Sequence, residues 1–204
     1  MNSTAHRKSK VIAAIPARGG SKRLLRKNIY PFFSKPLLAW TIDAAKRAKG
    51  IDGVFVSTED EEIADIAREY GSDVINRPLQ LAEDNSPKMV VIRHADDWLK
   101  RERNINARIL VSLQANSPEI APIDITRGLE MMSKNGLWEV MSVNPDGIQN
   151  AAIRLIRTSA LYNDFLSAHI GVIQTDYIDV HTIDDINILK DRYGTQDRLE
   201  AVRG

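Results

Sequence analysis

The chain has 204 residues, of which 43% are hydrophobic and 27% are charged, so its composition is that of a soluble globular protein and its length suits one domain with its own core. Its 28 basic and 27 acidic residues give a formal net charge of +1, which excludes a global field that would attract nucleic acid or an anionic membrane. The absence of cysteine excludes thiol catalysis and disulfides, and it fits a cytoplasmic location.

The first residues are polar and basic, and they precede no apolar stretch of the length that a signal peptide needs. We interpret residues 1–10 as a flexible leader and residues 11–204 as a single domain. No later run has the length and apolar character of a membrane span. We therefore expect neither a membrane nor a nucleic acid as a partner.

Short runs of β-branched residues alternate with helical patterns along the chain. The first half is predicted to contain a strand at 11–15, a helix at 37–49, a strand at 54–56, a helix ending at 70, a strand at 73–75, a helix from 86 to about 101 and a strand at 109–113. The second half is predicted to contain a helix at 122–134, strands at 139–143 and 152–156, a short helix at 159–166, strands at 170–173 and 177–180, a helix at 183–193 and a polar tail after 194.

Three of the helices have predicted caps at their amino ends. Thr58 with Glu61, and Thr182 with Asp185, each fit a capping box, in which two side chains and two backbone N–H groups bond reciprocally. Ser86 stands before a proline and fits an N-cap.

The alternation of strands and helices predicts an α/β fold, in which helices cover both faces of a mostly parallel sheet. Ligands of such folds bind at the carboxyl ends of the strands. The functional residues are therefore expected on the loops that follow strands.

The loop after the first predicted strand is rich in cations and glycine. It reads Arg18-Gly19-Gly20-Ser21-Lys22-Arg23 and continues to Arg26-Lys27-Asn28. Glycine lets the backbone approach a phosphate, arginine offers forked donors and lysine a mobile charge, so the loop predicts a polyphosphate site. The residue order fits neither a Walker A loop nor a dinucleotide fingerprint. A solvated basic surface loop is the alternative, but the position at a strand end favours phosphate.

Motifs along most of the chain are similar to those of a known family, the CMP-sugar synthetases, especially the acylneuraminate cytidylyltransferases. The matching runs are Ile15-Pro16-Ala17-Arg18-Gly19-Gly20-Ser21-Lys22, Lys27-Asn28-Ile29, Pro36-Leu37-Leu38-Ala39-Trp40-Thr41-Ile42, Val56-Ser57-Thr58-Glu59-Asp60, Arg77-Pro78 with Leu81-Ala82, and Leu113-Gln114 with Ser117-Pro118. The resemblance implies a three-layer αβα, Rossmann-like nucleotidyltransferase fold with a mostly parallel, mixed sheet.

The resemblance also implies roles for the residues of the phosphate loop. Arg18, Lys22 and Lys27 would hold the phosphates of CTP, and Arg18 and Lys27 would be catalytic. The loop 84–88 would lie near the cytosine. The full set of implied nucleotide-binding residues is Arg18, Gly20, Ser21, Lys22, Lys27, Asn28 and Ser86.

The implied acceptor and metal sites lie in the second half of the chain. Gln114, Asn116 and Ser117 lie where the family binds its acidic sugar, and Asp179 falls on the first aspartate of the metal-binding Asp-x-Asp pair. Mg²⁺ is the expected ion, with Asp179 as a catalytic group through it.

The second aspartate of the pair is replaced by His181. This histidine could bind substrate, act as a base or ligate a softer ion such as Mn²⁺. Asp185 could supply the missing carboxylate, although it also fits an ordinary helix start.

The implied reaction is attack of a sugar hydroxyl on the α-phosphate of CTP, which gives a CMP-sugar and pyrophosphate. The acceptor would be an N-acetylneuraminate-like nonulosonate or a related 2-keto sugar acid. Two alternatives stay open: a transferase for another nucleotide or acceptor, and a nucleotide-binding protein with weak activity.

Two departures from the family pattern bear on the substrate and the assembly. The run Ala115-Asn116-Ser117-Pro118-Glu119-Ile120 has an anion where the family has a cation, beside the expected sugar site. The chain after Val143 is also shorter than in members with an extended dimerisation arm. A homodimer is still expected.

Overall fold

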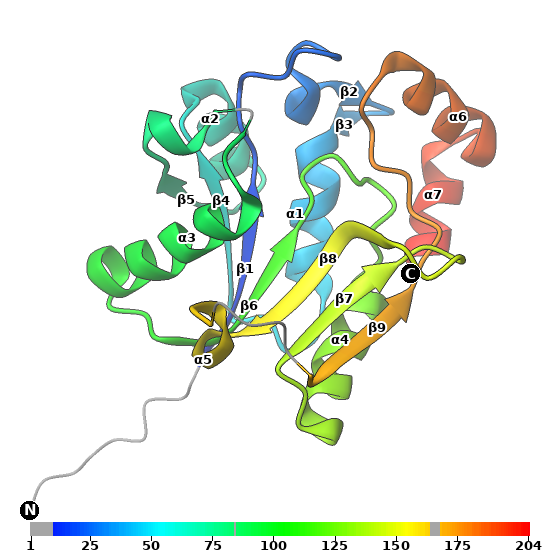
Figure 1. Cartoon of the computed structure of the whole chain (residues 1–204). Helices are drawn as coiled ribbons and strands as arrows, with labels where there is room; N and C mark the ends of the chain where they lie inside the picture. The colour runs from blue at the N-terminus through cyan, green and yellow to red at the C-terminus, as the bar shows by residue number, and fades with distance from the viewer. Residues whose placement is uncertain (1–9, 84, 164–167) are drawn as a thin grey trace, which may run out of the picture.

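The computed structural model describes residues 10–83, 85–163 and 168–204. Within these residues a sheet of seven strands has the order β5-β4-β1-β6-β8-β7-β9 (Figure 1). Only β8 runs antiparallel to its neighbours. The strands are β1 (Lys10–Pro16), β4 (Gly53–Thr58), β5 (Asp73–Asn76), β6 (Ala107–Leu113), β7 (Glu139–Val143), β8 (Gln149–Arg157) and β9 (Ile170–Gln174).

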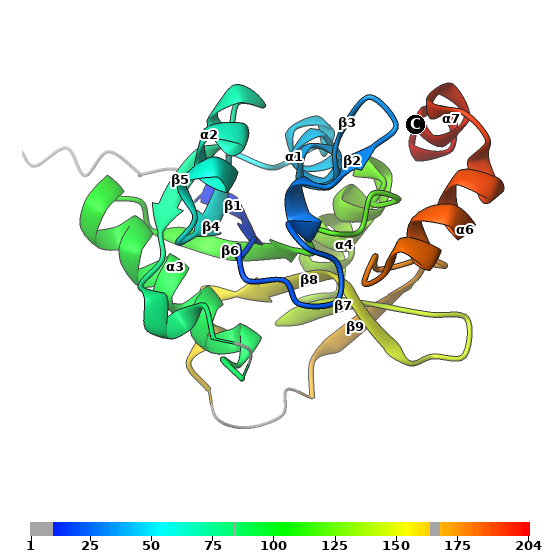
Figure 2. The same cartoon turned by 90° about the horizontal axis from the view of Figure 1, so that it is seen from above.

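Helices cover both faces of this sheet (Figure 2). One face carries α1 (Leu37–Arg47), α2 (Glu61–Glu69) and α4 (Pro122–Asn135), and the other carries α3 (Lys88–Arg103) and α5 (Thr158–Leu161). The fold is therefore a three-layer αβα sandwich with a mostly parallel, mixed sheet, as predicted. Of the helices in the described ranges, none is long and apolar enough to cross a lipid bilayer.

Strand β1 explains why both faces are covered. Val11, Ala13 and Ile15 pack under α1, while Ile12 and Ala14 pack under α3. Successive side chains of a strand point to opposite faces, so a continuous apolar run of this kind needs a helix on each side. The run ends at Pro16, where the chain leaves the sheet as the cation-rich loop.

A smaller core lies beside the sandwich, formed by the hairpin of β2 (Pro31–Phe32) and β3 (Lys35–Pro36) with α6 (Ile183–Tyr193) and α7 (Gln196–Arg203). The prediction of a polar tail after residue 194 is therefore wrong. The guanidinium of Arg203 is buried and donates to the carbonyl oxygens of Trp40 at 2.6 Å and Ile120 at 3.0 Å. Arg203 thus fastens α7 to the rest of the domain. Hydropathy does not predict this contact, because arginine is a polar residue that is seldom buried.

The capping box of Thr182 and Asp185 is confirmed at the start of α6. The cap predicted at Thr58 is wrong, because β4 runs through Thr58 and the helix begins three residues later. Asp60 is the N-cap of α2, and its carboxylate accepts the N–H of Ile63 at 3.0 Å.

The cap predicted at Ser86 is also wrong. Pro87, with an extended ψ of 133°, is the residue before α3, and Ser86 instead donates to the carbonyl of Gln80 at 3.1 Å. The helix predicted at 159–166 is the single turn Thr158–Leu161, and residues 164–167 lie outside the described residues. No strand forms at 177–180. Of the other predicted elements, the strand 139–143 and the helix 183–193 are confirmed with their predicted ends, and the rest are confirmed with shifted ends.

Candidate active site

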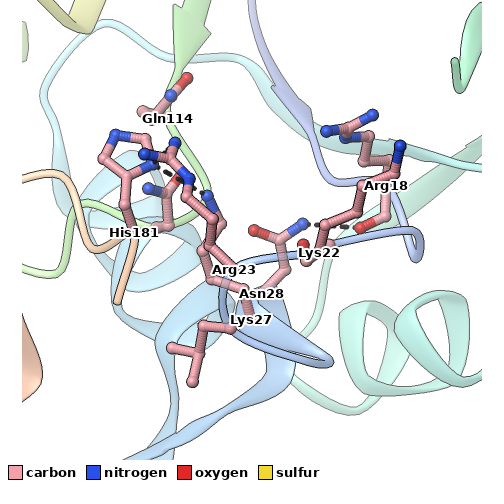
Figure 3. A pocket seen from close by; sticks show the side chains of 10 residues that line it. Arg18, Lys22, Arg23, Lys27, Asn28, Gln114 and His181 are labelled. Atoms are coloured by element: carbon pink, nitrogen blue, oxygen red, sulfur yellow. Dashed lines mark hydrogen bonds between the residues drawn. The ribbon is translucent and has the colours of Figure 1, made fainter. Parts of the chain in front are cut away.

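The loop after β1 borders a cavity of about 470 Å³ at the carboxyl ends of the central strands (Figure 3). Three stretches that are far apart in the sequence meet there: this loop, the end of β6 and the segment before α6. The lining residues are Arg18, Ser21, Lys22, Arg23, Leu24, Lys27, Asn28, Gln114, Asn116 and His181. Most of the predicted site residues are thus brought to one place.

The two glycines of the loop have different surroundings. A Cβ on Gly19 would lie 2.3 Å from Oδ2 of Asp60, whereas a Cβ on Gly20 would meet nothing within 4 Å. The N–H of Gly19 donates to the Glu59 carboxylate at 2.7 Å. Close packing therefore requires glycine at position 19. Gly20, the predicted nucleotide contact, is exposed at the rim and does not line the cavity.

Acidic residues after β4 hold the far end of the loop. Arg26 has a left-handed backbone with φ 55°, and its guanidinium pairs with Asp60 at 2.5 Å and with Glu62. The next three residues form the short 3₁₀ helix η1 (Lys27–Ile29). Within it the buried Asn28 donates to the carbonyl of Arg18 at 2.9 Å. Asn28 therefore ties the two ends of the loop together and leaves the cations facing the cavity (Figure 3).

Four cationic side chains line this cavity: Arg18, Lys22, Arg23 and Lys27. No carboxylate is among its described lining residues. Burial lowers the pKa of Lys27, and Arg23 lowers it further, against the opposite effect of Asp179. Arginine offers forked donors and lysine a mobile point charge, so a cavity lined by four such side chains suits a polyphosphate.

His181 borders the cavity beside Arg23, across from Arg18 and Lys22 (Figure 3). Its Nδ1 lies 2.9 Å from Nη2 of Arg23 and 3.5 Å from Nζ of Lys27. Both partners are donors, so Nδ1 accepts and the imidazole is neutral. Burial and these two cations lower the pKa of His181. This arrangement links the phosphate loop directly to the segment that precedes α6.

The loop after β6 fixes Asp179 beside the cavity. The fully buried Ser117 donates its hydroxyl to Oδ1 of Asp179. Asn116 and Val180 exchange two hydrogen bonds, of 2.9 Å from the Val180 N–H and 2.6 Å from the Asn116 amide. Ser117 does not line the cavity, and its hydroxyl is directed to Asp179. Asn116 lines the cavity, and its side-chain amide donates one of its two hydrogens to the carbonyl of Val180.

Glu119 does not lie beside the expected sugar site, which corrects the sequence interpretation. Its buried carboxylate accepts the N–H of Ile178 at 2.6 Å, the guanidinium of Arg192 at 2.8 Å and the hydroxyl of Tyr193. It lines neither of the two cavities at this edge of the sheet. The anion therefore anchors α6 and the residue before Asp179.

A second cavity, of about 210 Å³, adjoins the first, and Arg18 and Gln114 line both. Its other walls are Pro16, Arg77, Leu81, Glu83, Ser86, Lys88 and Val91. Arg77 donates to the hydroxyl and carbonyl oxygens of Ser57, and burial lowers its pKa to about 10. Ser86 thus lies in this smaller cavity, and Asp84 of the same loop lies outside the described residues.

The residues of the described ranges contain no group of three or more His, Asp or Glu that could hold a metal. One oxygen of Asp185 accepts the N–H groups of His181 at 2.7 Å and Thr182 at 2.8 Å, so it is committed to the helix cap. Asp179 has one oxygen bound to Ser117, and burial raises its pKa. Mg²⁺ is often held by one or two carboxylates plus substrate phosphates and water; Asp179, which acts electrostatically on Lys27 but does not itself line the cavity, would be the carboxylate of such a site.

Two further cations of the site, Arg23 and Lys88, had no individual role predicted from the sequence, although Lys88 belongs to the loop 84–88 that the resemblance implies near the cytosine. Arg23 stands in the basic run that defined the phosphate loop, but no role was expected for it. Lys88 is the first residue of α3 and donates to Oε1 of Gln114 at 2.9 Å. A lysine at a helix start opposes the helix dipole, and this unfavourable placement was the available signal.

The chain matches the family described as Cytidylyltransferase over residues 12–161. N-acylneuraminate cytidylyltransferase A of Danio rerio is 37% identical over 145 residues, which are 70% of this chain and 33% of that protein. CMP-N,N'-diacetyllegionaminic acid synthase of Legionella pneumophila is 35% identical over 150 residues, which are 72% of this chain and 63% of that protein.

Solved structures share the fold. A CMP:2-keto-3-deoxy-manno-octonic acid synthetase complexed with CTP superposes with a TM-score of 0.70 at 18% identity, covering 91% of this chain and 99% of that one. Rv0371C of Mycobacterium tuberculosis, solved as a complex with manganese, has a TM-score of 0.64 at 16% identity, covering 90% and 99% of the two chains.

The matched region of the chain spans about a third of the length of the Danio rerio relative. The family match itself covers β1 to α5, which includes the phosphate loop and the end of β6. The chain therefore belongs to the cytidylyltransferase family.

Proposed function

We propose that the protein transfers CMP from CTP to the hydroxyl of an acidic sugar, a nonulosonate or a related 2-keto sugar acid, and releases pyrophosphate. The observation that carries this proposal is the cavity of about 470 Å³ lined by four cations, at the end of β1 in a cytidylyltransferase chain. The names of the relatives, which act on N-acylneuraminate and diacetyllegionaminic acid, support the acceptor class.

The triphosphate would lie against Arg18, Lys22, Arg23 and Lys27. The cytosine would occupy the end of the smaller cavity that Arg77, Leu81 and Ser86 line. Arg18 lines both cavities and would contact the nucleotide between its base and its phosphates. Gln114, at the end of β6, would face the acceptor.

Catalysis would rest on positioning and on neutralising charge. The acceptor oxygen forms a bond to the α-phosphorus, the bond from that phosphorus to the β-phosphate oxygen breaks, and the hydroxyl loses its proton. Lys27, whose ammonium is partly desolvated, would stabilise the negative charge on the transferred phosphate. A divalent ion on Asp179, either Mg²⁺ or Mn²⁺, would screen the phosphate oxygens when bound.

The direct test is a coupled assay of pyrophosphate release with CTP, Mg²⁺ and a panel of nonulosonates and 2-keto sugar acids. We expect release only when CTP and one of these sugars are both present. Thermal shifts with CTP, UTP, ATP and GTP would show whether cytosine is preferred, because a ligand stabilises the state that binds it. No release across the panel would contradict the proposal.

A nucleotide-binding protein with little turnover is the second candidate. One observation favours it: the position of the family's second metal-binding aspartate holds His181, whose Nδ1 is engaged by Arg23. Binding of CTP without product from any sugar would support this candidate. A homodimeric state and a cytoplasmic location stay predictions, which sedimentation and cell fractionation would check.

A further inference from the structure

Lys88 reaches from the first turn of α3 to the ends of two strands in the middle of the sheet. Its Nζ donates to Oε1 of Gln114 at 2.9 Å and to the carbonyl of Ala151, on β8, at 3.0 Å. Gln114 lines both cavities, and Lys88 lines the smaller one. The ammonium group therefore lies where the two cavities meet.

Both acceptors of Lys88 are neutral oxygens. Neither described hydrogen bond of its ammonium goes to a carboxylate, and Asp179 favours its charged form electrostatically. Burial lowers the pKa of Lys88 to about 8. An ammonium has three donors, and a desolvated cation without a counter-ion is costly. The third donor of Lys88, and a charge to which no carboxylate is hydrogen-bonded in the described residues, are therefore available to an anionic ligand.

The backbone around Lys88 is shaped to hold it. Ala151 has φ 59°, a left-handed conformation that few residues other than glycine adopt. Its carbonyl accepts the bond from Lys88, while the carbonyl of the next residue, Ala152, accepts the N–H of Gln114 at 3.0 Å. Such backbone strain persists where the surrounding structure enforces it, and it concentrates at functional sites.

Strand order places Lys88 away from the base end of the smaller cavity. Arg77 follows β5 and bonds to Ser57 on β4, whereas Lys88 bonds to residues at the ends of β6 and β8. Strand β1 lies between β4 and β6, and neighbouring strands are about 4.8 Å apart. Lys88 is therefore displaced from Arg77 toward the side of Asp179.

The phosphates of CTP already have four cations on the loop after β1, and cytosine carries no negative charge. The remaining anion in the proposed reaction is the carboxylate of the acceptor. We infer that Lys88, held by Gln114 and Ala151, binds the carboxylate of the acidic sugar and makes the site specific for sugar acids over neutral sugars. This inference rests on the proposed function and names a specificity-determining residue for it.

The test compares the wild-type protein with Lys88→Gln and with Lys134→Gln, which removes an exposed lysine of α4. Each is assayed with the nonulosonate that turns over, N-acetylneuraminate first, and with its C1 carboxamide. Wild type and Lys134→Gln should prefer the acid, with a KM about ten- to a hundredfold lower than for the amide. Lys88→Gln should lose this preference, and its CTP-induced thermal shift should be unchanged.

The outcomes separate the inference from the proposed function. No turnover by the wild type with any sugar contradicts the proposed function. Turnover by the wild type with an undiminished acid preference in Lys88→Gln overturns the inference alone. A weakened CTP shift in Lys88→Gln, with an unchanged KM for the sugar, also overturns it, because Lys88 would then serve the nucleotide.

A rescue experiment guards against a merely structural effect. The chain has no cysteine, so alkylation of the Lys88→Cys protein with 2-bromoethylamine restores an ammonium group at this one position. We expect the acid preference to be lost in Lys88→Cys and to return after alkylation. A preference that stays absent after complete alkylation, in a protein that still shows the CTP shift, counts against the inference.

Discussion

Gly19 lies so close to Asp60 that a Cβ on it would fall 2.3 Å from the carboxylate Oδ2. The same carboxylate pairs with Arg26 at the other end of the loop. We therefore expect Gly19→Ala to displace the loop and raise the KM for CTP about ten- to a hundredfold, the cost of overpacking a rigid site. Gly20→Ala is the matched control, since its Cβ meets nothing. Equal damage from both substitutions would contradict the proposed geometry of the loop.

Lys27 is expected to act on the transferred phosphate rather than on folding. Lys27→Ala should lower kcat about 100- to 1000-fold, as loss of one transition-state donor does, while the thermal midpoint without CTP stays near that of the wild type. Lys49→Ala, which removes an exposed lysine after α1, should leave kcat unchanged. Steady-state kinetics with saturating CTP would check both variants. A normal kcat in Lys27→Ala would contradict the proposed role of this loop in catalysis.

Ser117 should act through Asp179. Its buried hydroxyl holds one oxygen of that carboxylate, as an outer partner holds a metal ligand. Ser117→Ala should raise the Mg²⁺ concentration for half-maximal activity about ten- to a hundredfold, with little change in the KM for CTP. A titration with Mg²⁺ and with Mn²⁺ measures this, and Ser133→Ala on the exposed face of α4 is the control.

Glu119, the one acid of the β6–α4 loop, should matter for stability. Its carboxylate accepts from Ile178, Arg192 and Tyr193, so Glu119→Ala removes the acceptor of the buried Tyr193 hydroxyl and of the half-buried Ile178 N–H. We expect the free energy of unfolding to fall by about 3 kcal/mol. Urea denaturation would measure it, with Glu130→Ala on α4 as an exposed control. A loss no larger than that of the control would refute the anchoring role.

The titration of Lys88 should make the free energy of unfolding depend on pH. Its pKa is lowered from 10.5 to about 8 in the folded protein, so between these values the unfolded chain binds more protons than the folded one. The free energy of unfolding of the wild type should therefore rise with pH across this window, by up to roughly 3 kcal/mol relative to Lys88→Met. Nearby Asp179 and Arg154 act in both proteins. A difference independent of pH would contradict the desolvated state of Lys88.

Sequence patterns predicted those elements whose cause is local. The apolar run of β1 and the reciprocal caps of Thr182 and Asp185 depend on neighbouring residues, and both are confirmed. The cap at Thr58 failed because two capable residues, Thr58 and Asp60, stand within one turn. The end of β4 decides between them, and strand length is set by pairing with β1 and β5.

In the candidate site, too, features with a local cause could be predicted from the sequence and features set by distant residues could not. The cations of the loop after β1 could be predicted, because charge and glycine at a strand end have one main use. The directions of Glu119 and Ser117 could not, since each side chain is turned by partners about 60 residues or more away, at Asp179 and Arg192. The contacts of Lys88 could not be predicted, because its partners are Gln114, just after β6, and Ala151 in β8, and only the folded sheet brings these together.

The contact between Arg23 and His181 joins residues 158 positions apart, and the bond from Arg203 to Trp40 spans 163. Contacts of such long range carry the largest loop-closure entropy and form after the local ones. The cation-lined cavity should thus be among the last parts to assemble during refolding and among the first to open in the native state. Amide exchange at 178–182 would then be faster than in β1, and a bound polyphosphate, by bridging both walls, would slow it.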